Sequence, residues 1–327
     1  MSSLLALTWM DQRRTQELCA ALGVELAVLK TPQRGALRYL VLSARTVALL
    51  VRRRVDVVLV QNPSLVLAVL CVLLRPLLGF RLVVDAHNEA VTPYINRQRW
   101  VKWLSAWVIR RSDLTIVSNR QLAHLVDAIG GSSLSLPDPI PVPPAPGAAC
   151  VLPPAFNVVL IATHARDEPI AEVFEAVRGL DLQLHVTGNP RHLDPRVAAA
   201  VPANVRLTGF LPDQDYWGLL RSADGIIDLT LMDHCLVSGA YEALALGKAM
   251  LLSDNAACRE LFGDAACYTN NATADIRRAI LELRSRHEQL ELAAQGKRAE
   301  LARRWETTAR DLMAWVAGAP AEARRGG

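Results

Sequence analysis

The sequence predicts an α/β protein with two Rossmann-like domains, and three observations lead to this prediction. The chain has 327 residues, which corresponds to about two domains of the usual ~150 residues. Hydrophobic residues make up 51% and charged residues 21%, a balance that suits folded cores and argues against disorder. Short β-branched runs alternate with helical patterns throughout, as in parallel sheets built from βαβ units.

The first half of the chain has five predicted strands, each followed by a helical pattern. The strands are expected at Leu4–Leu7, Glu25–Leu29, Val55–Val60, Arg81–Asp85 and Leu114–Ser118, with helices at about 12–22, 35–53, 64–78, 95–111 and 119–129. The longest apolar run, 65–80, is interrupted by Arg75 and Pro76, so we expect a buried helix there and no membrane span.

A proline-rich stretch separates the two halves. Eight of the eighteen prolines lie between Pro137 and Pro154, a density that excludes helix and central strand and indicates a stiff, extended hinge. A second series of strands follows, expected at Asn157–Ala162, Leu182–Thr187, Val205–Leu207, Gly225–Leu229 and Ala249–Leu252, before a helical tail from about 272 to 317. We therefore expect an amino-terminal domain at 1–142, a hinge at 143–155, a second domain at 156–295, and a carboxy-terminal helix and loose tail at 296–327 that packs back across the domains.

Several classes of protein are excluded by missing motifs. The six cysteines lie far apart without CxxC or zinc spacing, which disfavours a disulfide scaffold or structural metal and suits a reducing cytoplasm. The first residues do not form a secretory signal, so we expect the mature chain to begin at Met1. No GxGxxG follows the first strand and no GxxxxGK[ST] occurs, which argues against a dinucleotide cofactor and a P-loop NTPase. Nucleic-acid-binding signatures are not evident either.

Charge is concentrated in the first half. Residues 1–150 hold 17 Lys and Arg against 9 Asp and Glu, which suggests a face that meets an anionic partner. Within this half, Trp100, Trp103 and Trp107 fall on one side of a predicted helix that is flanked by arginines and a lysine. This composition fits a helix lying in the headgroup layer of an anionic membrane. The alternative is an ordinary amphipathic helix with its tryptophans packed on its own sheet.

The stretch that follows Asp228 is the most informative about ligands. A strand ends near Asp228, a loop follows, and Ser238-Gly239 opens a helix. We expect the amides of the first turn, with Gly239 allowing close backbone approach, to bind a diphosphate. Glu242 would then lie beside the anion, where a carboxylate can accept two ribose hydroxyls. The alternative is structural, with Ser238 as a helix cap and Glu242 as a surface residue matched to the helix dipole.

Asp213-Gln-Asp215 spells DxD, a pattern that binds metal in some transferases. It follows Pro212 and precedes an apolar helical run, so we interpret Asp213 as a helix N-cap and expect no metal there.

The helix after the loop resembles a known family. The run GAYEALALGKAMLLSD, residues 239–254, is similar to the acidic helix motif of the GT-B glycosyltransferases, especially family 4, in which two glutamates eight positions apart bracket the donor. Glu242 matches the second glutamate, which in the family holds the ribose. At the first position this sequence has His234, preceded by Asp233. The resemblance implies a metal-independent fold of two Rossmann-like domains that face a cleft.

Motifs in the first half resemble a second group. VQNPS at 60–64 and VVDAHNE at 83–89 are similar to motifs of the β-1,4-mannosyltransferases that extend lipid-linked chitobiose. Both follow strands, and His87 lies beside Asp85, where an imidazole could orient an acceptor hydroxyl or take its proton. The alternative is that His87 only fixes the loop. The resemblance implies an acceptor side formed by Gln61, Asn62, His87, Asn88 and Glu89.

The second half supplies the remaining donor residues. The loop THARDEP at 163–169 occupies the place where the family positions an Arg and a Lys on the diphosphate, and only Arg166 is available, with His164 as support. LHVTGN at 184–189 and LTGF at 207–210 correspond to units that line the base pocket. The resemblance implies a donor site of His164, Arg166, Thr187, Gly188, Gly209, His234, Ser238, Gly239 and Glu242, with His87, Arg166 and Glu242 as catalytic candidates.

These observations predict a cytoplasmic hexosyltransferase, peripheral to the inner face of a membrane. It would move a sugar from a nucleoside diphosphate sugar to a lipid-linked saccharide in polysaccharide or glycoconjugate synthesis, with no cofactor besides that donor substrate. Two alternatives stay open: a nucleotide-sugar epimerase of the same fold, and a catalytically silent GT-B subunit that binds a partner. Family 4 implies retention at the anomeric carbon, whereas the mannosyltransferases imply inversion, and the sequence does not choose between them.

Overall fold

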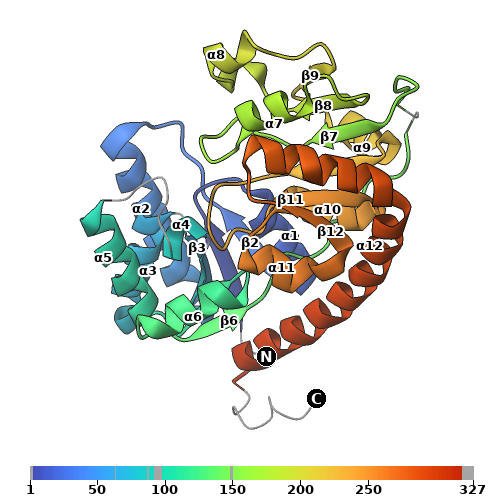
Figure 1. Cartoon of the computed structure of the whole chain (residues 1–327). Helices are drawn as coiled ribbons and strands as arrows, with labels where there is room; N and C mark the ends of the chain where they lie inside the picture. Colours follow the sequence, from blue (N-terminus) through green and yellow to red (C-terminus); the bar gives the residue numbers. More distant parts are fainter. Residues whose placement is uncertain (1–2, 63, 87, 92–97, 148–149, 319–327) are drawn as a thin grey trace. The chain divides into compact units, whose positions relative to one another are not determined.

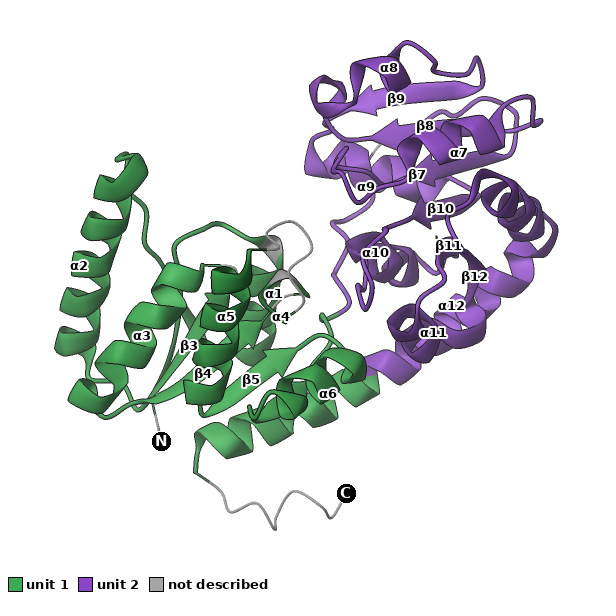
Figure 2. Cartoon of the chain, turned by 60° about the vertical axis from the view of Figure 1, so that its left-hand side comes forward, with its two compact units in different colours: residues 1–139, 303–327 green, residues 140–302 purple. Residues whose placement is uncertain are grey.

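The structure is a computed structural model that describes residues 3–62, 64–86, 88–91, 98–147 and 150–318. The chain divides into two compact units, shown in different colours in Figure 2. Unit 1 comprises residues 1–139 and 303–327, and unit 2 comprises residues 140–302. Each unit is described by itself.

Unit 1 is built on a six-stranded sheet in which all neighbours pair in parallel, in the order β2-β1-β3-β4-β5-β6. Its strands are β1 (Leu4–Thr8), β2 (Glu25–Val28), β3 (Val57–Asn62), β4 (Arg81–Ala86), β5 (Leu114–Val117) and β6 (Ser133–Ser135). Every residue of β3 is buried, as expected for a central strand covered on both faces. Because the strands are parallel, their carboxyl ends lie at one edge of the sheet.

Helices cover both faces of this sheet (Figure 1). They are α1 (Arg13–Leu22), α2 (Gly35–Arg53), α3 (Leu65–Leu78), α4 (Asn88–Val91), α5 (Arg99–Arg111) and α6 (Arg120–Ala128). Residues of α2, α3, α5 and α6 join one hydrophobic core, and α1 joins the other. α3 continues through Pro76, which lies in its last turn, so the helix ends only at Gly79 in the left-handed conformation.

Unit 2 repeats the plan with a parallel sheet ordered β12-β11-β10-β7-β8-β9. Its strands are β7 (Asn157–Leu160), β8 (Gln183–Thr187), β9 (Val205–Gly209), β10 (Gly225–Asp228), β11 (Ala249–Ser253) and β12 (Ala266–Thr269). The helices are α7 (Ile170–Val177), α8 (Pro195–Ala198), α9 (Asp213–Ser222), α10 (Ser238–Leu246) and α11 (Ala256–Phe262), with short 3₁₀ turns at Pro190–His192 and Gly263–Ala265. One core lies under α7 and the other under α9, α10 and α11.

The last helix, α12 (Thr273–Val316), contributes to both units. Its residues up to Ala302 are counted with unit 2, and those from Arg303 onward with unit 1. In unit 1, Trp305 Nε1 donates to the Pro137 carbonyl at 3.1 Å, and the Arg81 guanidinium lies 4.6 Å from the centre of the Trp315 ring. Leu312 and Val316 complete the core that α1 also covers.

Several details differ from the sequence predictions. The short elements α4, β6 and β12 were not predicted. Asp213 is the first residue of α9 and Pro212 is its N-cap, so Asp213 is not the cap. Residues 137–147 and 150–156 contain neither helix nor strand, in keeping with their proline content. None of the helices in the described part of the chain is long and apolar enough to cross a membrane.

Candidate functional site

The amino end of α10 in unit 2 is packed against its own sheet. The Gly239 N–H donates to Asp228 Oδ2 at 2.8 Å. A Cβ on Gly239 would come within 2.6 Å of that oxygen and 2.7 Å of Ile161 Cδ1, so no larger residue fits. The helix has no side-chain N-cap, and Ser238, its first residue, is exposed. Gly239 therefore allows the close approach of β10, and the amide that we expected to face a phosphate is bonded to Asp228.

Asp228 ends β10 and has an unusual environment for a carboxyl group. Burial raises the pKa of Asp228 well above its usual range. Glu168, Glu242 and Asp167 raise this pKa further through their negative charge, whereas the hydrogen bond from Gly239 opposes the shift. The sequence reasoning treated Asp228 only as the end of a strand.

Glu242 lies on α10 beyond the first turn and is only 6% exposed. Tyr216, from α9, donates its hydroxyl to Glu242 Oε2. The contact joins two helices of the same unit, so it holds the carboxylate in one orientation. Tyr216 was not among the predicted site residues, and no motif in the sequence indicates it.

The loop after β7 forms a ring of donors around Glu168. The backbone N–H groups of Thr163, His164 and Ala165 donate to its carboxylate at 3.0, 2.8 and 3.3 Å, and Thr163 Oγ1 donates at 2.7 Å. Converging backbone N–H groups of this kind bind anions. Here the anion is a side chain of the same loop. Arg166, which the sequence placed on the diphosphate, is exposed on this loop.

His164 lies against the end of β8. Its backbone is in the left-handed region, at φ 62°, and a Cβ on Gly188 would come within 3.0 Å of its Nε2. Burial lowers the pKa of His164, although the Glu168 carboxylate and a hydrogen bond with the Gly188 backbone oppose this effect. The imidazole is therefore held toward its neutral form.

Two other predicted residues of this edge differ in exposure. Thr187 is buried and its Oγ1 accepts the Ala162 N–H at 3.1 Å, so its side chain joins the ends of β7 and β8. Gly209 ends β9 with φ 75°, and a Cβ there would meet nothing within 4 Å. We therefore assign Thr187 a structural contact, while Gly209 borders open space.

The loop between β10 and α10 is tied to the loop after β7. Thr230 Oγ1 donates to Asp167 Oδ2 at 3.0 Å, and the Leu231 N–H donates to the Asp167 carbonyl. His234 lies on this loop, half-buried and with φ 59°. The structure thus brings together the loops that follow β7, β8 and β10. These loops carry the predicted donor residues His164, Arg166, Gly188 and His234, and Thr187 ends β8 beside them.

A polar network occupies the carboxyl edge of the sheet in unit 1. Gln61, at the end of β3, is 1% exposed and accepts from Thr8 Oγ1 at 2.9 Å. Asp85, at the end of β4, accepts from Arg14 Nη2 at 3.1 Å, and Arg14 also pairs with Asp138. Asn62 is equally buried. Arg14 was missed because it lies far from these residues in the sequence and belongs to no recognised motif.

The remaining acceptor residues are only partly described. Asn88 begins α4 and is half-buried. His87 lies outside the described residues, and so does the side chain of Glu89.

The three tryptophans of α5 differ in exposure. Trp100 is 61% and Trp103 63% exposed. Trp107 is half-buried and packs against the core of unit 1, so less of its side chain is accessible than of the other two, and the membrane contact of the three tryptophans stays a prediction. The helical spacing put the three on one side, but the boundary between core and solvent falls between them.

Two further features concern unit 2 and metals. A cavity of about 440 Å³ lies beside β8, β9 and α9, and none of the predicted donor residues lines it. Among the described residues, no group of three His, Cys, Asp or Glu side chains could hold a metal ion.

Comparisons with known proteins agree with this architecture. Residues 4–134 match the family model of the glycosyl transferase 4-like domain. Sucrose-phosphate synthase from Thermosynechococcus elongatus superposes with a TM-score of 0.77 at 14% identity, covering 97% of this chain and 99% of that one. Anabaena HepE, solved in complex with UDP and glucose, gives a TM-score of 0.73 at 13% identity, covering 98% and 100%.

A solved structure described as a putative UDP-N-acetylglucosamine 2-epimerase from Listeria monocytogenes is also similar, with a TM-score of 0.60 at 15% identity over 90% of each chain. No curated protein matches the sequence. At these identities the structural matches establish the fold.

The two parallel α/β units define the GT-B fold. Residues 4–134, which are less than half of the chain, match the glycosyl transferase 4-like domain, and this match supports a glycosyltransferase activity.

Proposed function

We propose that the chain transfers a sugar from a uridine diphosphate sugar to a lipid-linked saccharide at an anionic membrane surface. The nucleotide is suggested by HepE, which has been solved with UDP-glucose and with UDP. The acceptor rests on the resemblance of residues 60–64 and 83–89 to the lipid-linked chitobiose mannosyltransferases. The reaction would serve polysaccharide or glycoconjugate synthesis.

One observation carries the donor assignment: the loops after β7, β8 and β10 meet at the carboxyl edge of the unit 2 sheet. Nucleotides bind at this edge in doubly wound sheets. Glu242 is held there by Tyr216 and is the candidate to accept the ribose hydroxyls. Arg166 is exposed on the first of these loops and is the candidate to stabilise the leaving diphosphate.

The membrane assignment rests on α5. Trp100 and Trp103 are exposed next to Arg99 and Lys102, which are exposed as well. Amphipathic aromatic side chains beside basic ones favour the headgroup layer of an anionic bilayer. We propose that this helix attaches the enzyme peripherally to the cytoplasmic face.

The donor assignment is tested by replacing Glu242 with Gln. If the carboxylate accepts ribose hydroxyls, loss of its charge should weaken UDP binding about tenfold or more and lower transfer at least as much. Calorimetry with UDP and GDP, and a transfer assay with UDP sugars, measure the two effects, and circular dichroism verifies the fold.

Glu172→Gln is the matched control, since Glu172 is an exposed carboxylate on α7 of the same unit. A Glu242→Gln enzyme with wild-type rate would exclude the assignment. If the wild-type protein binds no nucleoside diphosphate at millimolar concentration, the silent binding subunit becomes the better hypothesis.

An epimerase is the second candidate, because the Listeria structure shares the fold. An epimerase converts a nucleotide sugar without an acceptor. Incubation with a UDP sugar alone, followed by product analysis, separates the two reactions. Formation of a new nucleotide sugar would replace the transferase proposal with the epimerase.

A further inference from the structure

Helices α2, α3 and α5 lie side by side over one face of the unit 1 sheet (Figure 2). Their buried residues join one hydrophobic core, but each helix also presents large apolar side chains on its other side, away from the sheet. These exposed side chains are Leu37, Leu40 and Val51 of α2, Val66, Leu73 and Leu77 of α3, and Trp100 and Trp103 of α5. We call the surface that they form the outer face.

The middle helix, α3, contributes strongly to the outer face. Leu67 and Cys71 belong to its buried side. Val66, Leu73 and Leu77 recur at helical spacing on the opposite side, where Leu73 is 57% and Leu77 79% exposed. Single exposed apolar residues are ordinary, but a group of them on adjoining helices marks an interaction surface.

The charge of these three helices is entirely positive. They contain nine Lys and Arg residues and no Asp or Glu. Glu25 and Asp113, from neighbouring parts of unit 1, are paired with Arg53 and Arg75. Other basic side chains near the helix ends are exposed, namely Arg52, Arg54, Arg99, Lys102, Arg110 and Arg111. The outer face therefore combines apolar side chains with a positive charge.

The opposite face of unit 1 has neither property. It is covered by α1 and by the end of α12, which carry the acids Glu17, Glu306 and Asp311 among their basic residues. Among the described residues, no large exposed apolar side chain lies on α1 or on α12 beyond Ala302. The exposed apolar surface is thus specific to one side of the unit.

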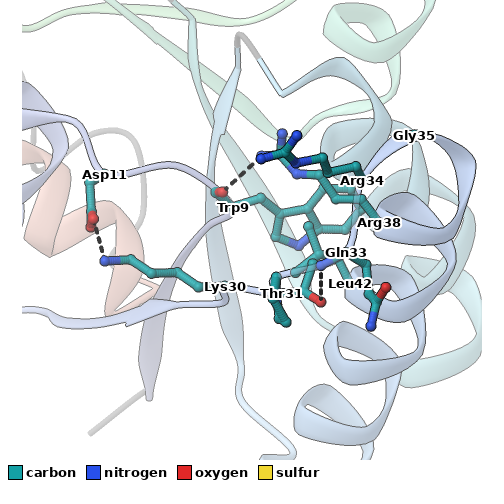
Figure 3. A pocket seen from close by; sticks show the side chains of 10 residues that line it. Trp9, Asp11, Lys30, Thr31, Gln33, Arg34, Gly35, Arg38 and Leu42 are labelled. Atoms are coloured by element: carbon teal, nitrogen blue, oxygen red, sulfur yellow. Dashed lines mark hydrogen bonds and ion pairs between the residues drawn. The ribbon is translucent and has the colours of Figure 1, made fainter.

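The side of α2 that faces the rest of unit 1 is different again (Figure 3). There Arg38 points toward Trp9 and donates to its carbonyl at 3.4 Å. Arg38 and Leu42 line a cavity of about 470 Å³, to which none of the exposed apolar residues of α2 contributes. The outer face is therefore a surface separate from this cavity.

We propose that the outer face of α2, α3 and α5 lies against an anionic lipid bilayer, with its leucines and tryptophans inserted at the level of the headgroups. Apolar side chains among basic ones and without acids are complementary to such a surface. A second copy of this chain would fit poorly, because a symmetric interface would bring two positively charged faces together. The inference rests on the proposed function, and it extends the membrane contact from α5 to α3 and α2.

This contact would bring the acceptor residues close to the lipid. The helices form a single layer, about 10 Å thick, between the sheet and the outer face. Gln61 and Asn62 end β3, and α3 begins at Leu65, only three residues later. The carboxyl edge of the sheet would then open along the bilayer, within reach of a saccharide that is attached to a lipid headgroup.

The test uses the full-length protein and sedimentation with two kinds of vesicle, pure phosphatidylcholine and a mixture of phosphatidylcholine with phosphatidylglycerol. The wild type should bind the mixed vesicles more tightly, and high salt should weaken this binding. The double variant Leu73→Ser/Leu77→Ser should weaken it about tenfold or more, because two leucines no longer enter the apolar layer. Arg52→Gln/Arg54→Gln should weaken it severalfold, because two charges near the anionic surface are lost.

Two matched controls in unit 2 should leave vesicle binding unchanged. Leu281→Ser/Leu292→Ser removes two exposed leucines from α12, and Arg191→Gln/Arg196→Gln removes two exposed arginines. Circular dichroism verifies that every variant is folded.

A fluorescent label reports on insertion directly. Leu77→Cys is made in a Cys150→Ser background, since Cys150 is the exposed cysteine, and is labelled with a dye that responds to polarity. Its emission should shift to the blue with the mixed vesicles, whereas the same dye at Leu292→Cys should not respond.

The proposal is overturned if Leu73→Ser/Leu77→Ser binds mixed vesicles like the wild type, or if pure phosphatidylcholine is bound equally well. It is also overturned if the wild type dimerises in gel filtration and Leu73→Ser/Leu77→Ser does not, which would make the outer face a protein interface. If only Trp100→Ser/Trp103→Ser loses vesicle binding, the attachment through α5 stands without this extension. Failure of the proposed transferase looks different: UDP binding and sugar transfer would be absent, while vesicle binding would still depend on Leu73 and Leu77.

Discussion

Individual carboxylates determine the chemistry of the carboxyl edge in unit 2. Glu168 accepts three backbone N–H groups of its own loop, and Asp228 accepts the Gly239 N–H of α10. Both donor groups are of the kind that hold phosphate when a nucleotide binds at a helix end or a nest. In this protein they are already bonded to the side-chain carboxyl groups of Glu168 and Asp228. A diphosphate that binds here must therefore either replace these two carboxyl groups at the backbone N–H donors or bind next to them.

We predict that Glu168→Gln strengthens UDP binding. Glutamine retains an oxygen that can accept the loop amides, but it removes the negative charge next to the expected diphosphate, so repulsion falls. A gain of about 1 kcal/mol, or about fivefold in affinity, is the expected size for one charge near the surface. Calorimetry with UDP measures it, with Glu175→Gln on the exposed side of α7 as the control. Weaker binding by Glu168→Gln would mean that the loop needs the charge to stay folded.

The raised pKa of Asp228 predicts a pH-dependent stability. An acid whose pKa is higher in the folded chain than in the unfolded chain takes up its proton on folding. The free energy of unfolding should therefore fall as pH rises from about 4, the unfolded value, toward the higher folded pKa, and stay low above it. The variant Asp228→Asn keeps an oxygen that can accept the Gly239 N–H, but it has no carboxyl group to lose a proton. Its free energy of unfolding should therefore not fall in this way, and the variant should be more stable than the wild type at neutral pH.

Denaturant unfolding from about pH 2 to about pH 8 measures the effect and covers the pH windows of both Asp228 and its control. Asp254→Asn is the control of opposite sign, because hydrogen bonds from Arg259 lower the pKa of Asp254 and its contribution is lost as pH falls. Equal pH profiles for Asp228→Asn and the wild type would show that Asp228 is solvated.

At the scale of elements, α5 divides its tryptophans between two roles. Trp100 and Trp103 are exposed, whereas Trp107 is half-buried and packs against the core of unit 1. We predict that Trp100→Ser/Trp103→Ser reduces sedimentation with anionic vesicles severalfold, because interfacial aromatic area is lost, while the unfolding free energy changes little. Trp107→Ser should instead lower the unfolding free energy by about 2 kcal/mol or more. Vesicle binding by the double variant equal to that of the wild type would exclude α5 as the membrane contact.

The elements could be predicted from the sequence where hydrophobic periodicity is strong. α2 spans the predicted range, and β1 to β5 start or end within two residues of expectation. The missed elements, α4, β6 and β12, have three or four residues, too few for a periodicity to appear. Contacts between residues that are distant in the sequence could not be predicted from hydrophobic periodicity. The bond between Asp228 and Gly239 depends on how α10 packs on β10, and the pair of Tyr216 and Glu242 depends on two helices meeting.

At the scale of the whole molecule, the two units do not follow the order of the chain. Unit 1 takes its last turns of helix from residues beyond Ala302, after all of unit 2. Leu312, 1% exposed, and Val316, 3% exposed, fill its core beside α1. The stability of unit 1 therefore depends on a segment that lies more than 160 residues from its other parts in sequence.

We predict that Leu312→Ala lowers the free energy of unfolding of unit 1 by about 2–5 kcal/mol, the usual result of a cavity at a buried leucine. Urea unfolding monitored by hydrogen exchange in β1, β3 and β4 reports on unit 1. Leu292→Ala is the control on the same helix, since Leu292 is 71% exposed. A variant Leu312→Ala with wild-type protection in these strands would show that the end of α12 adds little to unit 1.

This arrangement also affects how the chain is made. During synthesis, residues 1–139 leave the ribosome first, yet the helical turns that close their core are translated only after residue 302. The apolar side chains of α1 and of the central strands therefore stay exposed to solvent while all of unit 2 is translated, because the end of α12 that covers them is not yet made. Nascent chains stalled before residue 303 should therefore be the species that chaperones capture and proteases cleave.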